Sequence, residues 1–105
     1  MMNTQWTITL DCQAGPNDKP GTNANAAGMV GPRGATLTSE EIQNHPEAVK
    51  FRMFDDDDEE YYDGFIIVGE ENEAEFMPLD NFGEPNAGCT TIEFLNKKTG
   101  EWEQI

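Results

Sequence analysis

The apolar residues of this chain occur in short runs that alternate with polar residues, and no helical period between them is long enough to connect parallel strands. In the first run, Trp6, Ile8 and Leu10 alternate with threonines, so the three apolar side chains are expected to share one buried face of a strand. Such runs favour antiparallel strands. The other apolar runs lie at residues 49–54, 65–68, 90–95 and 101–105, and the run at 65–68 is apolar enough to be buried on both faces.

One short helix is predicted near residue 40. Thr38 is suited to cap its first turn, and Glu41, three residues later, can return a hydrogen bond to the Thr38 backbone. Pro46 disfavours helical geometry at the residue before it, which limits the helix to one or two turns. The expected fold class is therefore α+β: a small, mainly antiparallel β-sheet of about five strands with one short helix.

Residues 13–36 form a segment rich in Gly, Pro, Asn and Ala, which breaks any regular period. A loop of this length inside a compact domain is either a binding loop or a mobile excursion, and we expect a long mobile loop. The whole chain of 105 residues suits a single domain, residues 1–105, with one modest core. Further turns are predicted at residues 55–60 (a hairpin tip), 81–88 (a turn-rich link) and 96–100 (a hairpin loop with Gly100 in the left-handed position).

The charge of the chain is strongly negative, with 21 acidic residues, 6 basic residues and a formal net charge of -15. This charge repels polyanions, so direct binding to nucleic acid or to an anionic membrane surface is not expected. Cationic partners are expected instead: metal ions, basic small molecules or basic protein surfaces. No window is apolar enough to cross a bilayer, and the first residues lack the features of a signal peptide, so we expect a cytoplasmic protein.

The acidic residues are concentrated in one part of the chain, because residues 55–84 contain thirteen carboxylates and no Lys or Arg. A hairpin that carries such a run presents a negative ridge, and the second acidic stretch at residues 70–75 is expected to lie close to it. A ridge of this kind is suited to the phosphate-binding groove of a nucleic-acid-binding protein, as in a DNA mimic. The alternative is an acidic face that only provides solubility. The predicted partner-binding residues are Asp55, Asp56, Asp57, Asp58, Glu59, Glu60, Tyr61, Asp63, Glu70, Glu71, Glu73 and Glu75.

A Ca²⁺-binding module is a further alternative, because hard cations select clustered carboxylates. An EF-hand loop that starts at Asp55 would need Gly at its sixth position and Glu at its twelfth, where this chain has Glu60 and Ile66. A site of another type would draw on the remaining candidates, which are Asp57, Asp58, Asp63 and Asp80. No other cofactor is expected.

Catalytic motifs are missing from the sequence. His45 is the single histidine and precedes a proline, which favours a role at a helix end or on the surface. Neither a GxSxG motif nor a P-loop is present, so a non-enzymatic protein is expected. Cys12 and Cys89 fit no metal-binding spacing, and we expect free buried thiols, although a disulfide between them stays open.

The chain from residue 37 to residue 102 resembles small uncharacterised acidic proteins that are encoded in bacterial genomes and by phages and plasmids. The segments that carry the resemblance lie at residues 37–42, 45–49, 51–57, 61–64, 78–83 and 85–90. The resemblance implies the context of a mobile element, in which an inhibitor of host defence, such as an anti-restriction or anti-CRISPR protein, is plausible by analogy. It also implies a structural role for residues 85–89, with a positive φ at Gly88 and a buried Cys89.

Overall fold

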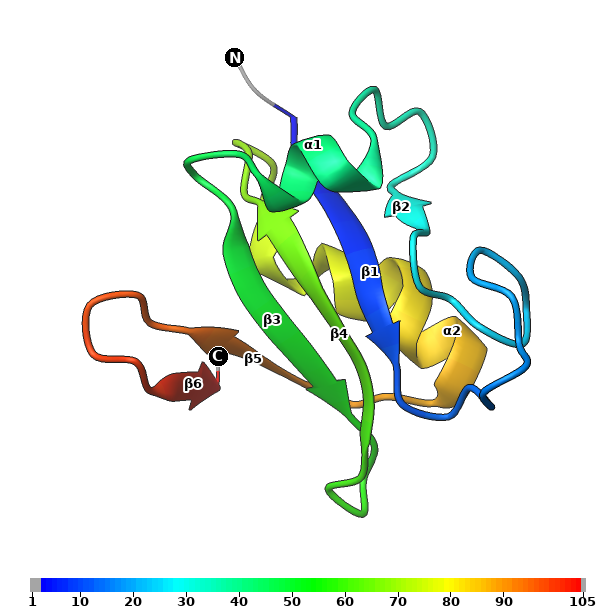
Figure 1. Ribbon diagram of the computed structural model, residues 1–105. Helices are drawn as coiled ribbons and strands as arrows, with labels where there is room; N and C mark the ends of the chain where they lie inside the picture. Colours follow the sequence, from blue (N-terminus) through cyan, green and yellow to red (C-terminus); the bar gives the residue numbers. More distant parts are fainter. Residues whose placement is uncertain (1–2, 105) are drawn as a thin grey trace.

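The structure is a computed structural model that describes residues 3–104, and its centre is one antiparallel sheet of six strands (Figure 1). The strand order is β2-β1-β4-β3-β5-β6, and every neighbouring pair is antiparallel. The predicted α+β class is confirmed, with one strand more than expected. The strands are β1 Gln5–Asp11, β2 Val30–Gly31, β3 Val49–Phe54, β4 Glu60–Ile67, β5 Thr91–Leu95 and β6 Trp102–Gln104.

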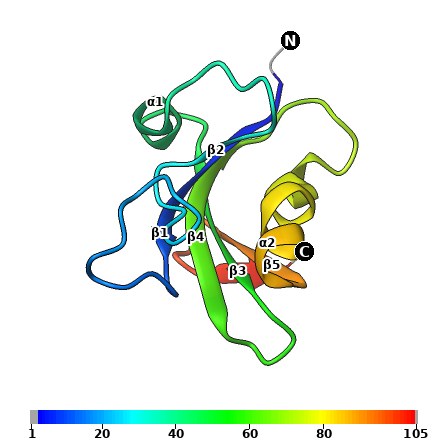
Figure 2. The same ribbon diagram turned by 90° about the vertical axis from the view of Figure 1, so that its right-hand side faces the viewer.

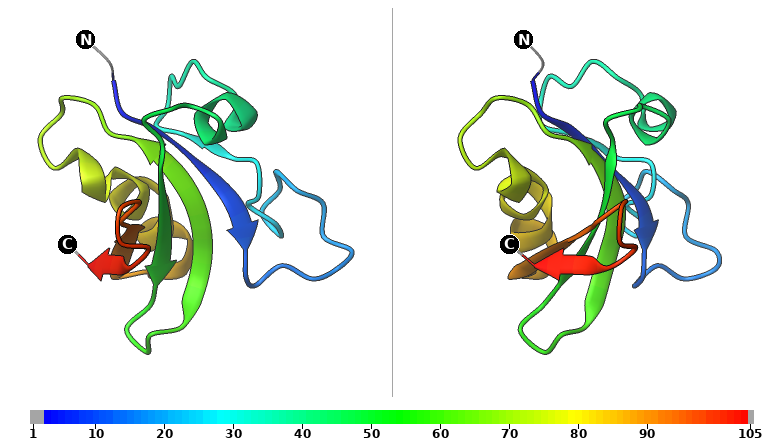
Figure 3. Two further views of the ribbon diagram at one scale, coloured as in Figure 1. Left: turned by 60° about the vertical axis from the view of Figure 1, so that its left-hand side comes forward. Right: turned by 90° about the vertical axis from the view of Figure 1, so that its left-hand side faces the viewer.

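Helical structure covers both faces of the sheet (Figure 3). The predicted short helix is α1, Ser39–Gln43, and its capping box is present: the Glu41 amide donates to the Thr38 hydroxyl (3.1 Å) and the Thr38 amide donates to the Glu41 carboxylate (2.9 Å). The opposite face carries residues 74–87, which we call the helical segment. It consists of a 3₁₀ turn (Ala74–Phe76), a π-helical turn (Leu79–Gly83) and the short helix α2 (Glu84–Ala87).

Two apolar cores hold these layers together. Alternation along β3 turns Phe51 and Met53 toward the helical segment, where they are fully buried with Leu79. On the other face, Ile42 of α1 is fully buried beside Ile67 of β4. Each such apolar side chain contributes about 1.5–3 kcal/mol when it is removed from water.

The predicted buried face of the first strand is correct for Trp6 and Ile8 but wrong for Leu10, which is 50% exposed. The register between β1 and β4 shifts between Ile8 and Leu10. A β-bulge of this kind inserts one residue and turns the following side chain to the other face of the sheet.

The segment of residues 13–36 is not a loop throughout, because it contains the edge strand β2. The connection into β2 is held to β1: the Ile8 amide donates to the Met29 carbonyl (2.9 Å) and the Gly28 amide donates to the Ile8 carbonyl (2.7 Å). Earlier in the segment, the Ala26 amide donates to the Asp11 carboxylate (3.0 Å). The mobility of this segment stays a prediction.

The third predicted strand begins earlier than expected and does not reach Val68, which is 39% exposed. Glu60 already pairs with Phe54, across a register shift that follows Met53. Close approach of β1 explains a glycine inside β4, since a Cβ on Gly64 would lie 2.0 Å from the Thr7 carbonyl oxygen.

The predicted turn-rich link at residues 81–88 is wrong, because this stretch is mostly helical. Its Gly and Pro residues start and stop a very short helix. Pro85 occupies the first turn of α2, where a missing amide hydrogen costs nothing, and Gly88 ends the helix with a φ of 69°. The positive φ expected at Gly88 is therefore confirmed, as is the one at Gly100 (φ 75°) in the hairpin between β5 and β6.

Candidate functional site

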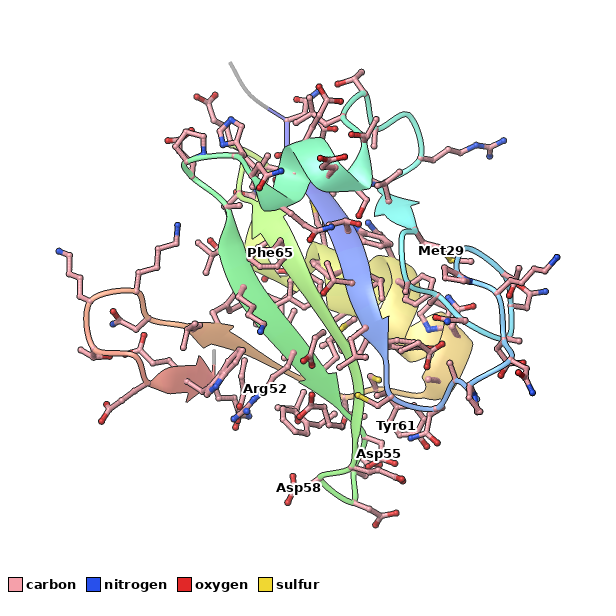
Figure 4. The ribbon with its side chains drawn as sticks, viewed as in Figure 1. Met29, Arg52, Asp55, Asp58, Tyr61 and Phe65 are labelled. Carbon is pink, nitrogen blue, oxygen red and sulfur yellow. The ribbon has the colours of Figure 1, made fainter. Side chains whose placement is uncertain are left out.

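The hairpin tip between β3 and β4, residues 55–59, is shaped by one of its own acids (Figure 4). The carboxylate of Asp55 accepts hydrogen bonds from the amides of Asp57 (2.9 Å) and Glu59 (3.0 Å). Asp58 takes the left-handed conformation that closes the turn, with a φ of 61°. With Asp55 bound to the backbone, the side chains left exposed at the tip are Asp56, Asp57, Asp58 and Glu59.

The second acidic stretch, residues 70–75, lies at the other end of β4, so the expectation that it adjoins the hairpin tip is wrong (Figure 2). The eight residues of β4 separate the two stretches by roughly 26 Å at about 3.3 Å per residue. Glu71 is tied to the first strand, because its carboxylate accepts from the Thr4 hydroxyl (2.7 Å) and from the Thr4 amide (3.1 Å). The hydroxyl bond lowers the pKa of Glu71.

The helical segment runs back between the two stretches and carries exposed acids of its own, Glu75, Asp80 and Glu84. Its C-terminal end returns to the base of the hairpin, where the Thr90 amide donates to the Phe54 carbonyl (2.9 Å). The segments that carry these exposed acids thus run along one side of the sheet (Figure 2). We call this set the acidic surface: Asp56, Asp57, Asp58, Glu59, Glu70, Glu73, Glu75, Asp80 and Glu84.

No basic side chain neutralises the acidic surface within residues 3–104, where the one ion pair joins Arg52 to Glu93 (2.8 Å). Alternation along β3 places Lys50 and Arg52 on the sheet face opposite the helical segment. The Arg52 guanidinium lies 4.1 Å from the ring centre of Trp102 and 5.2 Å from that of Phe54, so it is engaged on that face. The two basic residues of β3 and the acids of the helical segment therefore lie on opposite faces of the sheet.

Three predicted site residues lie apart from the hairpin tip, on β4: Glu60, Tyr61 and Asp63. Tyr61 is partly buried against the main core and Tyr62 is 7% exposed, so the expectation that alternation turns one ring inward is met by Tyr62. Burial first, and then Glu59, raises the pKa of Tyr61. Asp63 faces away from the helical segment and pairs in register with Arg52.

Asp63 belongs to a second acidic group, together with Glu60 and Cys12, whose ligand atoms lie within 4.8 Å of one another. The Cys12 thiol lies 3.8 Å from a Glu60 carboxylate oxygen, and Oδ1 of Asp63 is buried without a hydrogen-bond partner among residues 3–104. Burial, followed by the hydrogen bond and charge of Glu60, raises the pKa of Asp63 to about 7, against the opposing effect of Lys50 and Arg52. Burial and these two carboxylates raise the pKa of Cys12 to about 11, so the thiol is protonated and a poor nucleophile.

The proposed Ca²⁺ ligands do not meet. Asp57 and Asp58 lie at the hairpin tip, and Asp63 lies on the sheet face that also carries Arg52. Asp80 lies in the helical segment on the other side of the sheet. Among residues 3–104 the metal-capable side chains that do come together are Cys12, Glu60 and Asp63, and sequence spacing gave no sign of this group. The predicted Ca²⁺ site is therefore not assembled.

Both cysteines are free thiols, as expected, and no disulfide joins them. Cys89 is buried, as the resemblance implied, and burial raises its pKa to about 11. Cys12 is exposed at the end of β1, so the expectation of two buried thiols is wrong for this residue.

His45 follows α1 and accepts a hydrogen bond from the Glu47 amide through Nδ1 (3.1 Å). This bond holds the chain as it turns toward β3.

Within residues 3–104, none of the helices has the length and apolar character that crossing a membrane requires. Comparison of the chain with protein-family models, with curated proteins and with solved structures found no match.

Proposed function

We propose that this protein binds a basic protein surface through the acidic surface and thereby occludes a site that otherwise holds nucleic acid. One observation carries the proposal: nine exposed carboxylates lie on elements that run along one side of the sheet (Figure 2), and no Lys or Arg within residues 3–104 pairs with any of them. The carboxylates of such a surface repel one another, and binding of a cationic partner reduces that repulsion.

The charge density of this surface supports mimicry of nucleic acid. A duplex presents about one charge per 1.7 Å of its axis, or roughly 15 charges over the length of β4, and about half of them face one side. The nine exposed carboxylates are comparable in number. The Asp55 turn adds preorganisation, because the tip does not have to be ordered on binding.

The proposed partner is a nucleic-acid-binding protein of the host, and the proposed role is inhibition of host defence, of the anti-restriction or anti-CRISPR kind, in the cytoplasm. This part rests on the resemblance to phage and plasmid proteins. The mechanism needs no catalytic group: the protein occupies the basic groove and excludes nucleic acid.

The experiment is retention of host-lysate proteins on the immobilised protein at low salt, with and without excess duplex DNA, followed by mass spectrometry. We expect a nucleic-acid-binding protein that duplex DNA and raised salt both displace, because exposed charges are screened within about 8–10 Å at ordinary ionic strength. The test variant is D56N/D57N/D58N/E59Q, which keeps Asp55 and the turn.

The matched control is E40Q/E47Q/E101Q/E103Q, which removes the same number of exposed carboxylates from other parts of the chain. Loss of the partner in the tip variant alone supports the proposal. Equal loss in both variants indicates an effect of net charge, and retention that duplex DNA does not reduce contradicts mimicry. In the first of these cases the acidic surface serves solubility, and in the second the partner is bound at a site other than a nucleic-acid groove.

A further inference from the structure

A cavity of about 430 Å³ lies at the edge of the main core, away from the acidic hairpin tip. Its lining comes from three parts of the chain: residues 22–29, Tyr62 of β4 and the helical segment. Met29, labelled in Figure 4, lies on the connection that leads into β2 and is one of the lining residues. The volume falls within the range of about 300–1,000 Å³ that is usual for small-molecule sites.

Aromatic rings form the apolar part of the lining. Tyr62 of β4 and Phe82 of the helical segment meet edge to face, with ring centres 5.0 Å apart and planes at 70°. Trp6 supports Phe82 from behind, at 5.6 Å between ring centres, and is itself 3% exposed. Because these rings are held by the core, they offer a preformed wall for a flat ring.

The polar part of the lining presents hydrogen-bond acceptors. The Asn86 side-chain nitrogen donates to the Phe82 carbonyl (2.9 Å), which leaves its amide oxygen to accept. The Thr22 hydroxyl donates its hydrogen to the Lys19 carbonyl (2.7 Å), so its lone pairs remain. No group of residues 3–104 hydrogen-bonds to the hydroxyl of Tyr62, a residue that is 7% exposed. A ligand that carries hydrogen-bond donors can therefore use the acceptor oxygens of Asn86 and Thr22.

The charges around the cavity are negative. Asp11 of β1 pairs in register with Tyr62, and its carboxylate accepts from the amide of Ala26, another residue of the lining. Burial first, and then Asp11, raises the pKa of Tyr62 to about 12, so its phenol stays neutral and polar. The net charge of -15 adds a field that concentrates cations and repels anions.

We propose that this cavity binds a small aromatic amine, with its flat ring against Tyr62 and Phe82 and its ammonium group toward Asn86 and Thr22. The ring supplies apolar and aromatic contact with Tyr62 and Phe82, and the ammonium donates to the acceptor oxygens of Asn86 and Thr22. An apolar ring without an amine would leave these acceptors unmatched, and a carboxylate in place of the amine would be repelled. This site is independent of the acidic hairpin tip and of any protein partner.

The test is a titration at low salt with three probes that share one ring: tryptamine, indole and indole-3-acetate. We expect tryptamine to bind, indole to bind at least tenfold more weakly, and indole-3-acetate not to bind. Methyl NMR signals of Met29 and Ala26 report whether the probe enters the cavity. Equal binding of tryptamine and indole-3-acetate, or no binding of tryptamine, overturns the proposal.

Two variants distinguish the cavity from general attraction to an acidic protein. N86A removes one acceptor and should weaken tryptamine binding about threefold to tenfold, as expected for one hydrogen bond. N81A makes the same change at an exposed position of the helical segment outside the lining and should leave binding unchanged. Equal effects in both variants, or tryptamine shifts confined to the amides of residues 56–59, contradict the site. The variant D56N/D57N/D58N/E59Q should still bind tryptamine, so failure of the proposed partner does not remove this test.

Discussion

In each of the two acidic turns at the ends of β4, one carboxylate accepts hydrogen bonds that hold the backbone. The donors lie close in sequence at one turn and far away in sequence at the other. At the hairpin tip, Asp55 accepts from amides two and four residues away. At the other end, Glu71 accepts from Thr4, which is 67 residues away in sequence. The remaining acids of both turns are exposed and form no ion pair with any residue that the structure describes, 3–104. Asp55 and Glu71 therefore hold the backbone, and the other acids of the two turns are available to bind a partner.

The largest effect on stability is expected from substitution of Thr4, which makes the long-range contact with Glu71. Its hydroxyl donates to Glu71 and accepts from the Gly69 amide (2.7 Å), and the residue is fully buried. T4V keeps the shape but removes both hydroxyl hydrogen bonds. The Gly69 amide then loses its partner and Glu71 keeps only the bond from the Thr4 amide, so we expect a loss of about 2 kcal/mol in the free energy of unfolding. Urea unfolding measures it, and a loss no greater than that of D55A would show that the long-range contact is not the stronger one.

The second-largest effect on the free energy of unfolding is expected from Asp63, and this effect depends on pH. The raised pKa of Asp63 means that its protonated form is favoured in the folded state, so its stabilising contribution is complete below the unfolded pKa near 4 and is lost as pH rises through about 7. The groups that face it are Glu60 on its own strand, Cys12 at the end of β1, and Lys50 and Arg52 on β3.

D63N mimics the protonated form and should therefore match the parent protein near pH 4 and exceed its stability by about 1–2 kcal/mol above pH 8, after allowance for solvent screening. Thermal unfolding across this pH range measures the difference. A constant difference between the two proteins at every pH would contradict an Asp63 that titrates near neutrality.

A smaller effect is expected from the local turn. D55A removes two backbone hydrogen bonds at an exposed hairpin tip, where water replaces them in part, so we expect a loss of about 1 kcal/mol. D55N, which keeps an oxygen acceptor, should recover most of it. Amide hydrogen exchange at Asp57 and Glu59 reports the turn directly, and unchanged protection in D55A would show that other contacts hold the tip.

The smallest effect on stability is expected from the exposed acids themselves. D56N/D57N/D58N/E59Q should change the free energy of unfolding by no more than about 0.5 kcal/mol, in the stabilising direction, because like charges at a turn repel weakly in water. Denaturant unfolding in parallel with T4V and D55A places the three variants on one scale. A clear destabilisation would assign these acids a structural role and weaken the proposal that they serve a partner.

Local chemistry made several features predictable. The capping box at Thr38 and Glu41 depends on residues three apart, and the β3 run at residues 49–54 depends on alternation, so neither needs knowledge of the rest of the fold. Leu10 was placed on the wrong face because a bulge depends on how β1 meets β4. The helical segment was missed because its helices are too short to show a period, and the glycine and proline that delimit α2 are also typical of turns.

The sequence by itself determined the antiparallel β architecture, the negative charge and its concentration within residues 55–84, since these follow from residue type and spacing. Only the tertiary structure decided where that charge lies: β4 separates the two acidic stretches, and the helical segment reconnects them along one side. It also decided which carboxylates are engaged, as with Glu71 and Asp63, and it formed the cavity between residues 22–29 and the helical segment. The physical reason is that burial, hydrogen bonding and charge proximity depend on distances between residues far apart in the chain, which are set by the packing of the whole fold.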